Sequence, residues 1–195
     1  MAKAKAVVTS ARCLVGFGFH PDSELHRFYQ EINEELFKHC GVPRLSQTHA
    51  PHLTVLTLPR PPRAGNVEEA SVRLLSLGPN LPPLTVEIGG WGWFGSELSE
   101  FSNVHLKIVE SRDFRSVFRR LTRVMDGLLS PNEPYLPHIS FARWLSSVDR
   151  AKVRRYIKSR EPSIPFTHIR LDELVLFAKH NLGYRIHTRV PLPET

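Results

Sequence analysis

Apolar and polar positions follow two different periods along this chain, and the period separates strands from helices. The run over residues 7–19 is rich in β-branched and aromatic residues with polar interruptions, which predicts a strand. Residues 21–23 supply a turn and a helix cap, and apolar residues then recur at helical spacing from Leu25 to Leu36. Gly41 ends this helix. The chain is therefore expected to begin with a strand and a helix.

The same kinds of element follow. A strand is expected in "PHLTVLTLP" from Pro51, a helix over 67–77, and two neighbouring strands in "LTVEIGGWGWFG" and "NVHLKIVES". The clearest amphipathic helix is expected over 113–129. After it come a strand in "PHISFARW", a basic helix from Ser146 to about Arg160, and two strand-like runs, "FTHIRLDELVLFAKH" and "YRIHTRVPL", which predict a terminal hairpin.

These elements define an α+β protein with an internal similarity. Each half carries a helix followed by a strand of the pattern Pro-His-apolar-Ser/Thr. An internal duplication packed about a pseudo-twofold axis explains this repetition economically. We expect one domain over residues 1–195, with residues 1–6 as a flexible tail.

Composition narrows the class of protein. With 41% hydrophobic and 23% charged residues among 195, the chain has the profile of a soluble globular protein. Two cysteines, Cys13 and Cys40, are too few for a disulfide scaffold, and no Cys/His ligand spacing predicts a metal. No run approaches the length of a membrane span. We therefore expect a monomeric cytoplasmic protein away from membranes, with a nuclear location as the alternative if the source is eukaryotic.

Positive charge is concentrated in one part of the chain. Residues 112–161 hold twelve Lys or Arg against five Asp or Glu, an excess equal to the net charge of +7 of the whole chain. Such a concentration favours a polyanionic partner, nucleic acid before membrane. A solvated basic helix face is the alternative interpretation of the charge alone.

Two short motifs carry the candidate chemistry. "PHLTVL" begins at Pro51 and "PHISFA" at Pro137. Because residues i and i+2 of a strand point to the same side, His52 shares a face with Thr54, and His138 shares one with Ser140. A single strand histidine is more often structural. Two copies, each after a proline and each in the matching place of its half, favour catalysis.

The four side chains suit attack at phosphorus. One histidine removes a proton from water while the other donates one to the leaving oxygen. The two hydroxyls bind the non-bridging oxygens and stabilise the developing charge. This scheme requires no metal and no cofactor.

At this point the chain resembles a known family. Its paired motifs are similar to those of the 2H phosphoesterase superfamily, named for two His-x-Thr/Ser motifs, and most similar to the LigT family, the 2′-5′ RNA ligases that act as RNA 2′,3′-cyclic phosphodiesterases. The resemblance extends over nearly the whole chain. It rests on "RCLVGFGF", "HLTVLTL", "HISFAR" and "LDELVLFAKHNLGYRIHTRVPL".

The resemblance implies a fold and a reaction. The fold is a bilobal duplicated one with two antiparallel sheets, helices on the outside and a central groove that holds the active site. The reaction opens a 2′,3′-cyclic phosphate at an RNA end and leaves a 2′-phosphate, with possible ligation of 2′-5′ ends. The catalytic residues correspond to His52, Thr54, His138 and Ser140, and for this product we assign His52 as acid and His138 as base. The loop "TLPRPP", which follows the first motif, departs from the family pattern. We expect this departure to affect the shape of the rim of the groove beside that motif.

Four further residues are candidates for substrate binding. The family's arginine after the second motif corresponds to Arg143, which strict alternation puts on the opposite face from His138 unless the strand bulges or ends. Trp93 and Phe94 either stack on a nucleobase or belong to the core. Tyr184 either reaches the groove or packs in the core. The remaining histidines, His105 among them, are interpreted as surface or structural.

The alternatives lie partly within the same superfamily. They are cleavage of 2′-5′ oligoadenylates, trimming of an RNA 3′ end to a cyclic phosphate, and hydrolysis of a small cyclic nucleotide. A different class is a non-catalytic RNA- or nucleotide-binding module. RNA ends or oligonucleotides are the expected partners in most of these alternatives, because of the basic half.

Overall fold

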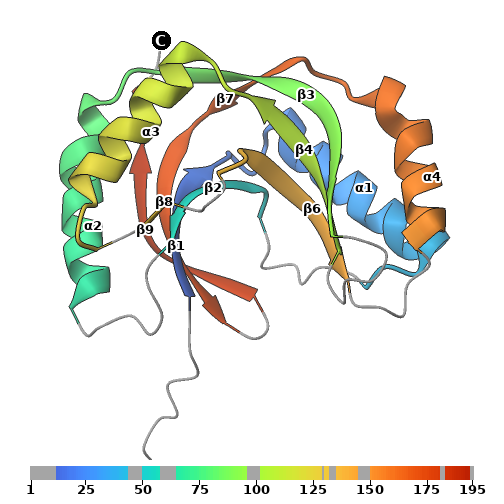
Figure 1. The fold of residues 1–195 in the computed structure, drawn as a ribbon, viewed down its shortest axis with the longest axis horizontal. Helices are drawn as coiled ribbons and strands as arrows, with labels where there is room; N and C mark the ends of the chain where they lie inside the picture. Colours follow the sequence, from blue (N-terminus) through green and yellow to red (C-terminus); the bar gives the residue numbers. More distant parts are fainter. Residues whose placement is uncertain are drawn as a thin grey trace, which may run out of the picture.

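The curled antiparallel sheet of this α+β protein is flanked by helices on two sides (Figure 1). The computed structural model describes residues 12–43, 50–57, 65–95, 102–128, 130–131, 135–144, 150–180 and 183–193. The expected tail over residues 1–6, most of the "TLPRPP" rim and Ser146 lie outside these ranges. In Figure 1, α1 and α4 lie together on one side of the sheet and α2 and α3 on the other.

The described elements are nine strands and four α-helices. In chain order they are β1 (Arg12–Gly18), α1 (Glu24–Cys40), β2 (His52–Thr57), α2 (Asn66–Leu77), β3 (Leu84–Phe94), β4 (Ser102–Val109), α3 (Arg112–Val124), β5 (Ser130–Pro131), β6 (His138–Trp144), α4 (Arg150–Arg160), β7 (His168–Leu171), β8 (Glu173–His180) and β9 (Gly183–Pro191). Short 3-10 turns follow α2 (Gly78–Asn80) and α4 (Glu161–Ser163). The third predicted helix ends earlier than expected, at Val124.

The capping residues explain where the helices begin and end. Ser23 accepts a hydrogen bond from the His26 backbone N–H at 3.2 Å, and Gly41 ends α1 in the left-handed conformation with φ of 69°. Ser111 caps α3 in the same way, accepting from the Phe114 N–H at 3.0 Å. The predicted apolar face of α1 is buried in the core.

The described strands form a single sheet rather than the two that we expected. Its order is β7-β3-β4-β6-β2-β1-β8-β9, with β5 paired to β2. The two motif strands, β6 and β2, are therefore central neighbours, with three strands beyond each of them. One backbone pair, Leu53 opposite Ile139, joins them, and this hydrogen-bonded connection is what makes one sheet out of two halves.

The run "FTHIRLDELVLFAKH" is two strands and not one. The break falls at Asp172, which accepts hydrogen bonds from two distant parts of the chain: its carbonyl from Leu192 N–H at 2.9 Å and its carboxylate from His20 N–H at 3.0 Å. β7 pairs with β3, whereas β8 pairs with β1 in the other half of the sheet. The expected terminal hairpin of β8 and β9 is confirmed.

Candidate active site

The two motif strands present their polar residues on one face of the sheet. Leu53 and Ile139 lie opposite each other and are both fully buried in the main core. Because adjacent strand residues point to opposite faces, the residues on either side of this pair point away from that core. These residues are His52, Thr54, His138 and Ser140. The antiparallel register puts His52 across from Ser140 and Thr54 across from His138, so each histidine faces a hydroxyl of the other motif.

The sheet opens immediately beyond this point. After Leu53, the edge of β2 that faced β6 is occupied by β5, where Leu56 pairs with Pro131. β6 diverges from β2 and continues along β4. The four polar residues therefore lie where the two halves of the sheet separate.

Both imidazoles are held in the same way. His52 Nδ1 lies 2.9 Å from the Ala50 carbonyl oxygen, and His138 Nδ1 lies 2.7 Å from the Leu136 carbonyl oxygen. A carbonyl only accepts hydrogen bonds, so Nδ1 carries the proton in both rings. Each acceptor precedes the motif proline. Nε2 is consequently the nitrogen of each ring that exchanges a proton with a ligand.

A β-bulge follows each motif at the same place. The register between β1 and β2 skips Val55, and the register between β4 and β6 skips Phe141, each three residues after its histidine. Both bulged residues are fully buried. A bulge inserts one residue into the alternation of a strand, so positions beyond it change face. The two motifs thus share backbone geometry as well as sequence.

The second bulge changes the interpretation of Arg143. In the ladder, Arg143 pairs with Asn103, which lies two residues before His105 on β4. Strict alternation from His138 therefore no longer applies at this position. The side chains of Arg143 and Tyr184 lie outside what the structure describes, so their proposed contacts remain predictions.

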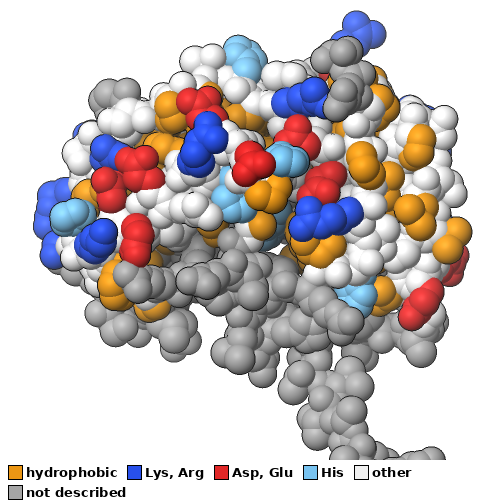
Figure 2. All heavy atoms as spheres, turned by 180° about the vertical axis from the view of Figure 1, so that it is seen from behind, with side chains coloured by type: hydrophobic (Ala, Val, Ile, Leu, Met, Phe, Trp, Pro, Cys, Tyr) orange, Lys and Arg blue, Asp and Glu red, His pale blue; other side chains and the backbone are white. Residues whose placement is uncertain are grey.

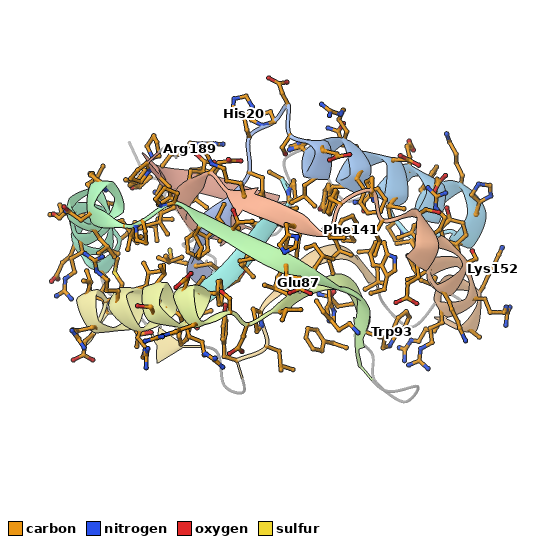
Figure 3. All side chains as sticks on the ribbon, turned by 90° about the horizontal axis from the view of Figure 1, so that it is seen from above. His20, Glu87, Trp93, Phe141, Lys152 and Arg189 are labelled. Carbon is orange, nitrogen blue, oxygen red and sulfur yellow. The ribbon has the colours of Figure 1, made fainter. Side chains whose placement is uncertain are left out.

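An aromatic ring from a strand two places away in the sheet packs against each of the two histidines. The ring centroids of Phe177 of β8 and His52 are 4.9 Å apart. Those of Phe94 of β3 and His138 are 4.8 Å apart, and this second pair is arranged edge to face. Phe94 is thus at the site. Trp93 is not at the site. It is adjacent to Phe94 in the strand, so its side chain points to the other face of the sheet (Figure 3). On that face the guanidinium carbon of Arg154 of α4 lies 4.5 Å from the centroid of the Trp93 ring.

A polar row on β4 extends the site and was not anticipated from the sequence. Asn103, His105 and Lys107 share the face of His138 and Ser140: His105 is paired with Ser140, and Lys107 with His138. The signal was present in "NVHLKIV", where three polar residues alternate with apolar ones. The strand itself is predicted correctly, but its polar face belongs to the site and is not ordinary surface.

His105 is buried among other rings. It is 4% exposed, stacks on Phe94 with centroids 4.0 Å apart, and lies 5.0 Å from His138. Gly92 is opposite it, and a Cβ at that glycine would collide with His105 Nε2. Burial, and after it the charge of the neighbouring His138, lowers the pKa of the His105 imidazole to about 3. The His105 side chain therefore lines the site as an uncharged imidazole at physiological pH.

This neutral histidine predicts a pH dependence of stability. Above pH 6.5 the imidazole is neutral in the folded and the unfolded chain and adds nothing. Between that pH and about 3 the unfolded chain binds a proton that the folded chain does not, so the free energy of unfolding falls by about 1.4 kcal/mol per pH unit. His105→Phe removes this contribution. The free energy of unfolding, measured by urea denaturation, should fall between pH 7.5 and pH 5 by about 2 kcal/mol less in the variant than in the wild type.

The matched control is His168→Phe, at an exposed position of β7. It should lose stability on acidification as the wild type does. Identical losses in wild type and His105→Phe would contradict a neutral, buried His105.

Two observations bear on other kinds of site. Within the described ranges, no three His, Cys, Asp or Glu side chains are grouped so that they would hold a metal ion. None of the described helices is long and apolar enough to cross a membrane.

The fold and the paired motif strands define an α+β phosphoesterase-type architecture. The chain matches the model of the 2′-5′ RNA ligase superfamily over residues 21–181, and it belongs to that superfamily, the 2H phosphoesterases. This confirms the family resemblance. Members of the superfamily are phosphoesterases and RNA-ligase-like enzymes. None of the curated proteins matches the chain.

Solved structures agree on the fold at low sequence identity. The protein TT0787 of Thermus thermophilus has a TM-score of 0.64 at 16% identity, covering 93% of this chain and 97% of its own. Escherichia coli LigT in complex with 3′-AMP has 0.57 at 18% identity, covering 94% and 99%. Usb1 of Kluyveromyces marxianus has 0.56 at 16% identity, covering 95% and 100%, and a further structure of that protein contains uridine monophosphate.

Proposed function

We propose that this protein is a phosphodiesterase that opens 2′,3′-cyclic phosphate ends of RNA and leaves a 2′-phosphate. The observation that carries the proposal is the matched pair of histidines, each with Nδ1 hydrogen-bonded to the carbonyl two residues earlier and each directed to the same face of the sheet. Two imidazoles that both hold Nδ1–H, on opposite sides of one phosphate, supply the base and the acid of a displacement at phosphorus when one ring is neutral and the other is protonated also at Nε2.

The reaction is balanced by two proton transfers. Water attacks the cyclic phosphorus while Nε2 of a neutral His138 takes its proton. The bond from phosphorus to O3′ breaks while His52, which starts as the imidazolium with a proton on both ring nitrogens, gives its Nε2 proton to the leaving oxygen. Lys107 is paired with His138 in the ladder. Solvent then returns both imidazoles to their starting state.

The two hydroxyls and Arg143 hold the phosphate in this proposal. Thr54 and Ser140 donate hydrogen bonds to the non-bridging oxygens, whose charge grows in the transition state. The guanidinium of Arg143 adds a charge-assisted contact. Support for its participation comes from the bulge at Phe141, which brings the Arg143 backbone opposite Asn103.

An RNA end is the proposed substrate because exposed cations lie on both faces of the sheet. Lys107 is exposed on the sheet face of His138, and α4 carries Lys152, Arg154, Arg155 and Lys158, all exposed. In Figure 2, Lys and Arg side chains lie among Asp and Glu side chains on the side where α1 and α4 lie. Phe94 offers a ring beside His138 for stacking.

The test is hydrolysis of an oligonucleotide that ends in a 2′,3′-cyclic phosphate, with the position of the product phosphate determined. We expect a 2′-phosphate and a rate that EDTA leaves unchanged, within about a factor of two. Strong inhibition by EDTA would indicate a metal enzyme. The same assay with a 2′-5′ oligoadenylate and with a free 3′-hydroxyl end distinguishes the other reactions of the superfamily.

A binding-only module predicts a different result. It would hold the oligonucleotide with a strong dependence on salt and leave the cyclic phosphate intact. Intact cyclic ends after prolonged incubation with correctly folded protein would therefore overturn the proposed reaction.

A further inference from the structure

The hydroxyl of Ser140 is held by a buried amide from the neighbouring strand. Asn103 of β4 is 2% exposed, and its Nδ2 donates a hydrogen bond to Ser140 Oγ at 2.8 Å. Asn103 lies two residues before His105, which is paired with Ser140 in the ladder. The contact therefore joins two adjacent strands on the face that carries the candidate site.

This hydrogen bond determines what the hydroxyl does next. A serine hydroxyl has one hydrogen to donate and two lone pairs that accept. With a lone pair directed at Asn103 Nδ2–H, the Ser140 hydrogen has to point to another acceptor. In the groove, a non-bridging phosphate oxygen is the acceptor that the proposed reaction brings.

The other half of the sheet lacks this device. Asn103 pairs with Arg143, which lies five residues after His138. In the other half, Thr57 lies five residues after His52 and pairs with Leu14. Leu14 therefore occupies the position that matches Asn103. A leucine side chain has no hydrogen-bonding group. The matched half thus shows that an apolar residue fits this position of the sheet.

Stability alone does not explain an asparagine at position 103. Within the described residues, its Oδ1 is buried without a hydrogen-bond partner, which costs free energy. A leucine, as in the other half, avoids that cost. The amide is therefore retained for what its N–H does at Ser140.

We infer that Asn103 is a positioning residue that orients the Ser140 hydroxyl toward the phosphate. This inference rests on the proposed function. It makes the two hydroxyls inequivalent: Ser140 is oriented before the substrate arrives, whereas the Thr54 half has no amide in the matched place.

Two double-mutant cycles test the inference. Asn103→Leu reproduces the residue of the other half with little change in volume. We expect it to lower kcat/KM by about tenfold in the wild type and in the Thr54→Ala background. In the Ser140→Ala background, the same substitution should change kcat/KM by less than about twofold, because the group on which it acts is absent.

An equal loss in all three backgrounds would mean a general structural effect and would overturn the inference, as would no loss in the wild type. The same cycles are repeated with a second readout, the affinity of each variant for a nucleoside 2′-monophosphate. This readout does not require turnover. A wild type that binds this nucleotide without hydrolysing cyclic ends refutes the proposed reaction, while the affinity cycle still decides the role of Asn103. A wild type that neither hydrolyses nor binds overturns both.

Discussion

Replacement of either motif histidine by alanine should lower kcat/KM for a cyclic-phosphate RNA end by about 10²–10⁴-fold, the usual contribution of a positioned acid or base. The loss is expected because each imidazole offers one nitrogen, Nε2, for proton transfer, while Nδ1 is committed to the Ala50 or Leu136 carbonyl. The doubly substituted protein should be little slower than either single variant, since acid and base act in one step. Rates with the purified variants measure this directly.

The fold should survive these substitutions. Neither histidine belongs to the main hydrophobic cluster, and the neighbouring Leu53 and Ile139 keep the strands together beneath them. Circular dichroism and a thermal melt establish this, and His168→Ala on β7 serves as the control at an exposed histidine. Near-normal turnover in either motif variant would refute the two-histidine scheme.

Gly16→Ala should cause the largest loss of stability, about 3 kcal/mol, with a Tm lower by about 6–12 °C. Gly16 of β1 faces Thr54 across the ladder, and a Cβ there would collide with the backbone carbonyl oxygen of Leu53. Backbone in the middle of a sheet cannot rotate aside as a side chain can. Because Leu53 connects His52 to Thr54, the displaced strand should also reduce kcat. Thermal and urea denaturation, with steady-state kinetics, measure both effects.

Gly89→Ala is the matched control, in β3 of the same sheet. The nearest atom to its added Cβ is Val109 Cγ2 at 3.3 Å, the end of an exposed side chain. We expect a change within about 1 kcal/mol. Equal effects of the two substitutions would show that the backbone contact at Gly16 is unimportant.

The local pattern of the chain predicted most of the elements and the common face of the two motifs. Alternating apolar residues identified the motif strands, and the shared pattern Pro-His-apolar-Ser/Thr placed His52, Thr54, His138 and Ser140 on a common face. This succeeded because the direction of a side chain in a strand depends on its immediate neighbours alone. The capped helix α1 was predictable for the same reason.

The features that the sequence did not predict concern relations between distant segments. The break at Asp172 depends on hydrogen bonds from His20 and Leu192, which no local pattern contains. Similarly, Trp93 and Phe94 were equivalent candidates by composition, and only the pairing of β3 with β4 decides which of them faces His138. The alternation in "NVHLKIV" indicated a polar strand face that includes His105, but its neighbours His138 and Phe94 become visible only when the strands are paired.

The connection between the motif strands has a mechanical consequence. Among the described residues, Leu53 and Ile139 form the one backbone pair that links β2 to β6, and beyond it the strands diverge. The spacing of the two imidazoles therefore depends on apolar side-chain volume beneath the site rather than on a rigid hydrogen-bonded ladder. Natural variation at these two buried positions can widen or narrow the gap between acid and base, and so tune which phosphate esters fit, while every polar group of the site stays the same.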